Sequence, residues 1–273
     1  MPCSMRYLLT LAGLPLLAGQ TQSVGSVIIY EITKDGAVVA ADSRKITTAD
    51  MNNKKVAYAH DDACKVFIIG GRAIAAYSGY DARAVRPGLP AWRATEILRV
   101  AASKLPMVTT NYPQALSEAW KKLLIQQYQS DYDAGVSLPP GVHENLIAAA
   151  LVIGFDSTKT ISFNFTRYYH DTRGMETEVL SLGPPDSPQM GSFGASDIQA
   201  EYSQGSSARS RQWHTQLDSA TPAARLSKLV QLTEEFSYVK LAGIPEVGGA
   251  VDVAQVDASG PRWISRKETC PAQ

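Results

Sequence analysis

Several motifs that mark common enzyme classes are missing from this sequence. It has no glycine-rich phosphate-binding loop and no Gly-x-Gly-x-x-Gly dinucleotide fingerprint, which weakens nucleotide-dependent chemistry. It also lacks Gly-x-Ser-x-Gly, the element with which α/β-hydrolases present their nucleophile. The four histidines are scattered, without an i, i+4 pair, and there is no Cys-x-x-Cys. We therefore expect neither a metal nor an organic cofactor.

An excess of charge of either sign is also lacking. Lys and Arg together number 26, as do Asp and Glu, and no basic stripe stands out. We therefore expect no nucleic-acid partner. Apolar residues make up 45% of the 273 residues and charged residues 19%, which is typical of a chain with a sizeable core. No repeat or domain boundary is evident, so one domain is predicted.

Apolar runs that approach the length of a membrane span are absent, and one shorter run lies near the N-terminus. Arg6 precedes an apolar run from Tyr7 to Ala18, and Pro15 interrupts that run. The run is too short to span a bilayer, and its positive start is typical of a secretory signal peptide. A buried N-terminal helix is the alternative interpretation.

The site at which such a leader would be removed is open. Cleavage near Ala18 or Gly19 fits the pattern, and so does cleavage after Gly25, where residues 23–25 have the small-x-small form. We predict a leader over 1–25 and a single domain over 26–273. The protein is then secreted or periplasmic, with no membrane span after leader removal.

Cysteine is scarce. Cys3 falls in the leader, and Cys64 and Cys270 remain. In an oxidising compartment two remaining cysteines are typical of one disulfide. Two unpaired thiols are the alternative, because pairing depends on a Cα separation that sequence does not contain.

The pattern of apolar residues predicts strands and helices in blocks. Apolar, β-branched runs and turn residues predict strands, and 3.6-residue periodicity with proline at first turns predicts helices. The expected strands are 26–33, 37–41, 65–70, 72–77, 146–156, 160–169, 176–182, 251–257 and 261–266. The expected helices are 92–105, 113–128, a short one from Asp197, and 222–238. Residues 45–62 are expected to be a loop or an exposed excursion, and 204–215 a loop. Blocks of like elements indicate an α+β fold of stacked layers with antiparallel sheets.

Three stretches carry a resemblance to a known family. They are "KDGAVVAADSR", "CKVFIIGGRAIAAYSG" and "VGGAVDVAQVDASGPRW", which together resemble the proteasome β-subunit family. "VIGFD" at 152–156 adds to the resemblance. It implies the N-terminal-nucleophile (Ntn) hydrolase fold, a four-layer αββα sandwich of two antiparallel sheets between helix layers.

The same resemblance implies a set of site residues. The family's freed N-terminal nucleophile, usually threonine, lies sixteen residues before the Asp of an Asp-Ser/Thr-Arg motif. Here that spacing joins Ser26 to Asp42, with Arg44 as a supporting residue. The family's lysine lies fourteen residues before an oxyanion-binding glycine, as Lys65 does before Gly79. The implied catalytic residues are therefore Ser26, Asp42, Lys65 and Gly79.

The chemistry of such a group is amide hydrolysis through an acyl-enzyme. A serine hydroxyl needs a base, and the α-amine of an N-terminal serine can serve as one. A lysine nearby lowers the pKa of amine and hydroxyl alike. The structural alternatives stay open: Ser26 as an ordinary strand residue, Asp42 and Lys65 as a buried ion pair, and Gly79 as a strand end.

Two family features are absent. The Asp-x-x-Ser-Gly motif before the last strands is replaced by residues 244–249, where Glu246 is the nearest acid. A family serine corresponds to Ala195, with Ser192 and Ser196 nearby. Two functions are therefore carried forward. One is an exported amide hydrolase acting on a peptide or small amide. The other is a catalytically inactive proteasome-fold structural or binding protein, and either could be a homo-oligomer.

Overall fold

The computed structural model describes most of the chain. The described residues are 22–24, 26–51, 54–83, 90–106, 108–136, 145–171, 174–238, 240–241, 243–268 and 270. Of the predicted leader, only 22–24 belongs to them, so the predicted signal peptide and the cut after Gly25 lie outside the described residues. Residues Gln22–Val24 form a short strand, β1.

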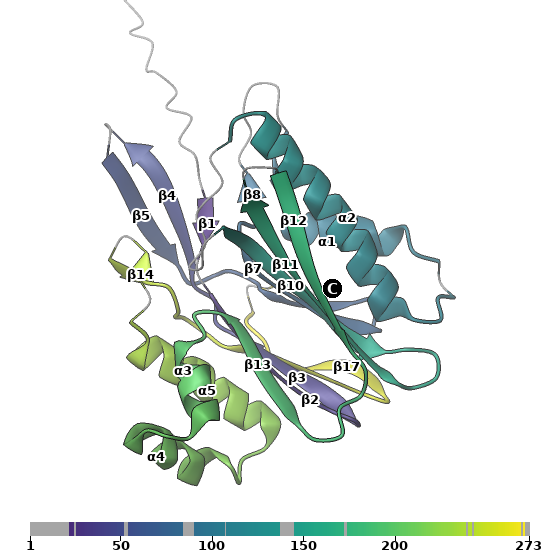
Figure 1. The fold of residues 1–273 in the computed structure, drawn as a ribbon, viewed down its shortest axis with the longest axis vertical. Helices are drawn as coiled ribbons and strands as arrows, with labels where there is room; N and C mark the ends of the chain where they lie inside the picture. The colour runs from purple at the N-terminus through teal and green to yellow at the C-terminus, as the bar shows by residue number, and fades with distance from the viewer. Residues whose placement is uncertain are drawn as a thin grey trace, which may run out of the picture.

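Two five-stranded antiparallel sheets form the centre of the molecule (Figure 1). The first sheet has the order β12-β11-β10-β7-β6, and its strands are Gly174–Leu182, Ile161–Asp171, Leu146–Phe155, Ala73–Gly79 and Val66–Ile69. The second has the order β13-β2-β3-β16-β17, and its strands are Gln189–Gly194, Val27–Thr33, Gly36–Ala41, Asp252–Asp257 and Gly260–Ser265. Every predicted strand is therefore present, and β13 is an additional one.

Helices cover the sheets. In the described part of the chain they are α1 (Ala94–Ser103), α2 (Tyr112–Asp133), α3 (Asp197–Gln204), α4 (Ala208–Leu217) and α5 (Pro222–Phe236). Helices α1 and α2 share an apolar cluster with the first sheet, and α3, α4 and α5 share another with the second (Figure 1). None of the helices in the described ranges is long and apolar enough to cross a membrane. The mixed α+β class with antiparallel sheets is thus confirmed.

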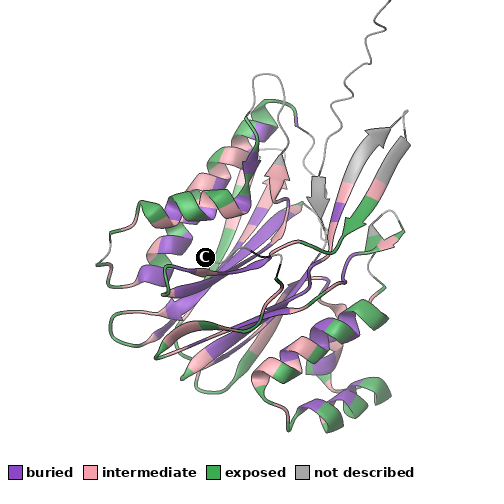
Figure 2. Ribbon diagram, turned by 180° about the vertical axis from the view of Figure 1, so that it is seen from behind, coloured by how far each residue is buried: buried purple, intermediate pink, exposed green. Residues whose placement is uncertain are grey.

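The hairpin of β2 and β3 is buried on both faces, as its dense apolar sequence predicts. Ile28 and Val39 point into an apolar cluster between the two sheets. Ile29 and Val38, one position along each strand, point into the cluster under α5. Figure 2 shows buried residues along both sheets, with exposed residues on the outer faces of the helices. Alternate residues of one strand therefore serve two cores.

Helix α2 runs five residues beyond its predicted end. Leu116, Trp120 and Tyr128 lie at helical spacing on one face of this helix, and all three are buried. Asp131 lies in this extension and is fully buried, and its carboxylate accepts hydrogen bonds from the Tyr80 hydroxyl and from the indole N–H of Trp92. Periodicity does not register such tertiary contacts of a polar residue.

Of the two alternatives for 45–62, a loop or an exposed excursion, the loop is wrong. β4 (Lys45–Met51) and β5 (Lys54–His60) form an antiparallel hairpin, and β1 pairs with β4. Of the hairpin side chains that the structure describes, Ile46 is buried, whereas Tyr58 and His60 are exposed. The two strands are paired along their backbones from Lys45–His60 to Met51–Lys54, and such pairing does not depend on an apolar sequence.

The prediction of a loop over 204–215 is also wrong, because α4 occupies Ala208–Leu217. The Ser207 side chain caps the helix by accepting a hydrogen bond from the Ser210 N–H at 2.9 Å. Only Ser210, Trp213 and Leu217 of this helix are buried. So narrow an apolar stripe is hard to find among polar neighbours. The short pairs β8–β9 (Ala82–Arg83, Trp92–Arg93) and β14–β15 (Lys240–Leu241, Ile244–Pro245) complete the fold.

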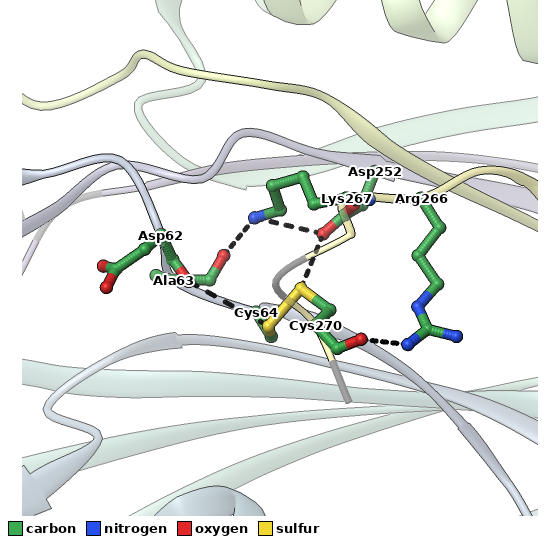
Figure 3. Close-up of a disulfide and its surroundings, with 7 residues drawn as sticks. All are labelled: Asp62, Ala63, Cys64, Asp252, Arg266, Lys267 and Cys270. Atoms are coloured by element: carbon green, nitrogen blue, oxygen red, sulfur yellow. Dashed lines mark hydrogen bonds and ion pairs between the residues drawn. A yellow bond between two sulfur atoms is a disulfide. The ribbon is translucent and has the colours of Figure 1, made fainter. Parts of the chain in front are cut away.

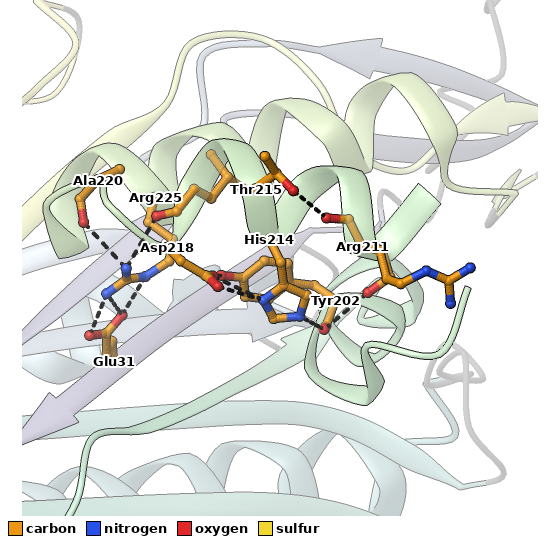
Figure 4. Close-up of polar contacts among 10 residues, drawn as sticks. Glu31, Tyr202, Arg211, His214, Thr215, Asp218, Ala220 and Arg225 are labelled. Carbon is orange, nitrogen blue, oxygen red and sulfur yellow. Dashed lines mark hydrogen bonds and ion pairs between the residues drawn. The ribbon is translucent and has the colours of Figure 1, made fainter. Parts of the chain in front are cut away.

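Helices α3 and α4 are joined by a histidine-centred network (Figure 4). The His214 ring stacks on Tyr202, and its Nε2 lies 2.8 Å from the carbonyl oxygen of Tyr202. Its Nδ1 lies 2.9 Å from the Asp218 carboxylate, which also accepts a hydrogen bond from the Tyr202 hydroxyl. Both ring nitrogens thus face acceptors, and the hydrogen bond to Asp218 raises the pKa of His214.

Candidate active site

A pocket of about 360 Å³ brings together three of the four predicted catalytic residues. Ser26 lies at the start of β2, Lys65 just before β6, and Gly79 at the end of β7, and all three line the pocket. They come from both sheets, so the pocket lies where the sheets meet. Asp42 and Arg44 do not line it.

Ser26 is buried, with 1% of its surface exposed. Its carbonyl oxygen accepts a hydrogen bond from the Ala195 N–H at 2.8 Å, and its hydroxyl donates to the Ser78 hydroxyl at 2.7 Å. Gly194 permits this close approach because its φ is +87° and a Cβ there would lie 2.0 Å from the Ser26 carbonyl oxygen. The backbone and the side chain of Ser26 are therefore both held in place.

Asp42 is fully buried, and its carboxylate accepts four hydrogen bonds. Oδ1 accepts from the Val27 N–H at 2.9 Å and from Lys65 Nζ at 2.7 Å. Oδ2 accepts from the Arg44 N–H at 3.0 Å and the Gly248 N–H at 3.1 Å. One carboxylate thus joins the start of β2, the segment before β6 and the 246–249 loop.

Lys65 is almost as deeply buried, with 7% of its surface exposed. Burial lowers the pKa of Lys65 below its usual value, and the negative charge and hydrogen bond of Asp42 oppose that shift. The carbonyl oxygen of Lys65 accepts a hydrogen bond from the Tyr77 N–H at 3.0 Å, which ties Lys65 to β7. The structure therefore holds a cation against the pocket wall with its counter-ion behind it.

Gly79 is a position that only glycine fits. Its φ is +114°, and a Cβ there would lie 2.4 Å from the Ile147 carbonyl oxygen and 2.6 Å from Ala148 Cα. Both of those atoms are backbone of the neighbouring strand β10 and cannot give way cheaply. Close strand packing therefore requires this glycine at the pocket wall, whatever its part in chemistry.

Arg44 has a structural environment. Its guanidinium makes two hydrogen bonds with the Asp61 carboxylate, at 2.8 and 2.9 Å, and one with the Val247 carbonyl oxygen at 3.1 Å. These bonds tie the β3–β4 connection to the 246–249 loop. Arg44 therefore supports the loop that donates the Gly248 N–H to Asp42.

The residues at the missing family positions lie near the site. Glu246 is buried, and among the described residues nothing hydrogen bonds to its Oε2. Burial raises the pKa of Glu246, which the positive charge of Lys65 opposes and the negative charge of Asp42 reinforces. Ser192 donates to Gln199 at 2.8 Å instead of to Ser26. The hydroxyl that does contact Ser26 belongs to Ser78.

The cysteines flank the same pocket. Cys64 lines the pocket and forms a disulfide with Cys270, with their Cα atoms 5.7 Å apart. Figure 3 shows Lys267 beside this bond, where its Nζ contacts the Ala63 carbonyl oxygen and the Asp252 carboxylate, the latter at 3.2 Å. The paired alternative for the cysteines is therefore the one found, and the C-terminal segment is fastened to the residue before Lys65.

Ser78 is the site residue that sequence reasoning missed. It lies one position before Gly79, and its signal in the sequence was only that adjacency, since a single serine inside a strand has no pattern of its own.

Within the described ranges, no group of three or more His, Cys, Asp or Glu residues could hold a metal ion. Comparison of the chain with protein-family models and with curated proteins finds no match.

Proposed function

We propose that this protein is an exported N-terminal-nucleophile amide hydrolase, similar to proteasome β subunits, that acts through an acyl-enzyme on Ser26. The observation that carries the proposal is the single pocket lined by Ser26, Lys65 and Gly79. Asp42 supports it from behind, because one of its oxygens binds both Lys65 and the backbone next to Ser26. These residues lie far apart in sequence and were grouped by family spacing alone.

The arrangement of the apolar clusters supports the Ntn type of fold. One cluster lies between α1, α2 and the first sheet, a second between the two sheets, and a third between the second sheet and α3 to α5. That order corresponds to a four-layer αββα sandwich. The proposed nucleophile then directly precedes β2, which lies between β13 and β3 in the second sheet.

The proposed reaction requires cleavage between residues 25 and 26, which separates β1 from β2 and frees the Ser26 α-amine. The amine takes the Oγ proton while Oγ attacks the amide carbon of the substrate. The Gly79 N–H binds the resulting oxyanion. As the C–N bond breaks, the leaving nitrogen takes the proton from the α-ammonium. Water then cleaves the ester on Ser26, and Oγ regains a proton.

The pocket lining bears on the substrate class. Besides the catalytic candidates it carries acidic and basic side chains: Asp62, Asp81, Glu96, Lys45, Arg93 and Arg99. A peptide or a small amide with polar groups suits such a lining. The disulfide at its edge supports an oxidising compartment, in keeping with a secreted or periplasmic protein.

A catalytically inactive structural or binding protein is the second candidate. Ala195 favours it, because this residue binds the Ser26 carbonyl oxygen through its N–H but offers no hydroxyl to an α-amine. Glu246 favours it too, because this carboxyl is buried behind the site instead of lining the pocket. In that case the buried pair of Asp42 and Lys65 serves folding alone.

Mass spectrometry of the exported protein, followed by reaction with a β-lactone that acylates hydroxyls, tests the proposal. We expect a mature chain that begins at Ser26 and a single adduct on that residue. Ser26→Ala abolishes the adduct, while Ser192→Ala, a matched serine outside the pocket, leaves it unchanged. An intact Gly25–Ser26 bond, or no adduct on Ser26, favours the inactive protein.

A further inference from the structure

We propose that Ser78 is a second hydroxyl of the catalytic centre, one that positions the Ser26 hydroxyl and then stabilises it as it loses its proton. This inference rests on the proposed function, because it assigns a role to Ser78 in the same reaction. No family position or sequence motif points to Ser78. The structure alone places it next to the reacting atom.

The contact is short and well defined. The Ser26 hydroxyl donates to Ser78 Oγ across 2.7 Å, a usual distance for a hydrogen bond between hydroxyls. The two residues are 52 positions apart, on β7 of one sheet and at the start of β2 of the other. Both line the pocket, so the bond lies where a substrate would enter. It therefore sets which way the Ser26 hydroxyl points.

The surroundings hold Ser78 against Ser26. A Cβ on Gly194 would come within 3.4 Å of Ser78 Oγ as well as 2.0 Å from the Ser26 carbonyl oxygen, so this glycine leaves room for both residues. On the other side, Gly79 fixes the end of β7 against β10. Ser78 thus lies between Gly194, which packs against the Ser26 carbonyl oxygen, and Gly79, the proposed oxyanion donor.

A serine hydroxyl can change its role within one bond. It carries one donor and two acceptor lone pairs, and its hydrogen rotates to suit the partner. At rest the Ser78 hydroxyl accepts a hydrogen bond from the Ser26 hydroxyl. When the Ser26 hydroxyl turns to the α-amine and gives up its proton, the Ser78 hydroxyl rotates and donates to the Oγ that now carries negative charge. No atom is lost or gained by Ser78 itself, and the hydrogen bond becomes stronger because its acceptor is charged.

The proposed role of Ser78 differs from that of the α-amine and of Lys65, the two groups of the centre that titrate. The α-amine and Lys65 set the pH at which the centre becomes active. Ser78 lowers the barrier at every pH, because its donor acts only on the developing charge. Its loss should therefore reduce the maximal rate of acylation and leave both the apparent pKa and the binding of the acylating reagent unchanged.

The test measures acylation of the mature protein by a β-lactone as a function of reagent concentration and pH. Ser78→Ala is expected to lower the maximal acylation rate roughly 10²-fold, as loss of one charge-stabilising donor does in other enzymes. Ser78→Thr keeps the hydroxyl and should recover most of the rate. Ser78→Cys, with a weak donor, should be intermediate, and Ser192→Ala should match the wild type.

Ser26→Ala separates the two proposals. If Ser26→Ala abolishes labelling and Ser78→Ala labels at the wild-type rate, the role of Ser78 is wrong and the proposed function stands. If wild type is not labelled, or Ser26→Ala still is, both proposals fail. A lower rate in Ser78→Ala with a shifted apparent pKa, or no recovery in a folded Ser78→Thr, means that Ser78 acts through the structure alone and overturns the inference.

Discussion

Lys65 Nζ and the Val27 backbone N–H bind the same oxygen of Asp42, at 2.7 and 2.9 Å. Val27 follows Ser26 directly, so one carboxylate oxygen sets the distance between the proposed nucleophile and the buried cation. The other oxygen of Asp42 holds the Arg44 and Gly248 N–H groups. Any substitution at Asp42 therefore alters the pocket through several segments at once.

The first prediction concerns Asp42→Asn. This change leaves the shape of the side chain but removes its charge, so the Lys65 ammonium is buried without a counter-ion. Breaking such a buried pair costs about 3–5 kcal/mol of the free energy of unfolding. Urea unfolding of the wild type and the variant measures the difference.

Asp61→Asn provides the control. Its partner is again a cation, Arg44, but the Asp61 side chain is 44% exposed. An exposed pair contributes only about 0.2–1 kcal/mol. Equal losses in the two variants would contradict the buried role of Asp42.

The second prediction compares two glycines with positive φ. Gly79→Ala forces a Cβ onto the backbone of β10, whereas Gly71→Ala, at φ +61°, meets nothing within 4 Å. We expect Gly71→Ala to cost about 1–2 kcal/mol from the left-handed backbone alone. Gly79→Ala should cost clearly more and also reduce β-lactone labelling. Similar melting temperatures for the two variants would argue against the close packing of β7 on β10.

The third prediction concerns the Cys64–Cys270 disulfide. It closes a loop of 206 residues in the unfolded chain and fastens the C-terminal segment beside Lys65. Replacing both cysteines by serine should lower the free energy of unfolding by about 2–5 kcal/mol. Chemical denaturation of both proteins gives that difference.

A reducing agent supplies the matching control for the disulfide. It should bring the wild type to the stability of the double serine variant and leave that variant unchanged. A reducing agent without effect on the wild type would mean that the two thiols are unpaired in solution.

The fourth prediction is a pH dependence at the α3–α4 junction. The pKa of His214 is raised in the folded protein, so its stabilising effect is fully present below the unfolded value of about 6.5. It is lost as the pH rises through the folded pKa. The pKa of Asp218 is lowered, so its effect changes only in acid, and that of Tyr202 is raised beyond this window.

Thermal unfolding at pH 6 and pH 8 tests this. The melting temperature of the wild type should fall between these values more than that of His214→Gln, which keeps a polar side chain but does not titrate. The network is largely exposed, so the effect should be small and weaker in high salt. Identical pH profiles of wild type and variant would exclude the doubly bonded histidine.

Elements with dense apolar patterns are the ones that sequence predicts well. The two-sided burial of β2 and β3 and the faces of α2 and α5 follow from residues such as Ile29, Trp120 and Leu229. Hairpin β4–β5 and helix α4 do not, because the first is paired along its backbone and the second buries a narrow stripe that includes Trp213. A polar segment looks like a loop in the sequence when the hydrogen-bond partners of its polar groups lie far away along the chain.

The candidate site divides in the same way. The resemblance to proteasome β subunits implied Ser26, Asp42, Lys65 and Gly79. In the structure Ser26, Lys65 and Gly79 line one pocket, and Asp42 binds Lys65. Whether they act in catalysis stays a prediction. The contact of Ser78 with Ser26 was beyond reach, because it joins strands of different sheets 52 positions apart. The sequence also could not decide whether Cys64 and Cys270 form a disulfide or remain free thiols, because pairing depends on the distance between their Cα atoms.

The hydrogen bonds of Asp42 reach segments that the ribosome releases at different times, so these bonds cannot all form together during synthesis. The bond of Asp42 to Val27 spans 15 positions, but its bond to Gly248 spans 206, so the ribosome must release nearly all of the chain before this carboxylate is satisfied. Contacts of such long range form late in folding. A chain that has not yet reached Gly248 therefore leaves one of the four hydrogen bonds of this carboxylate unmade, although every residue that lines the pocket lies between Ser26 and Arg99.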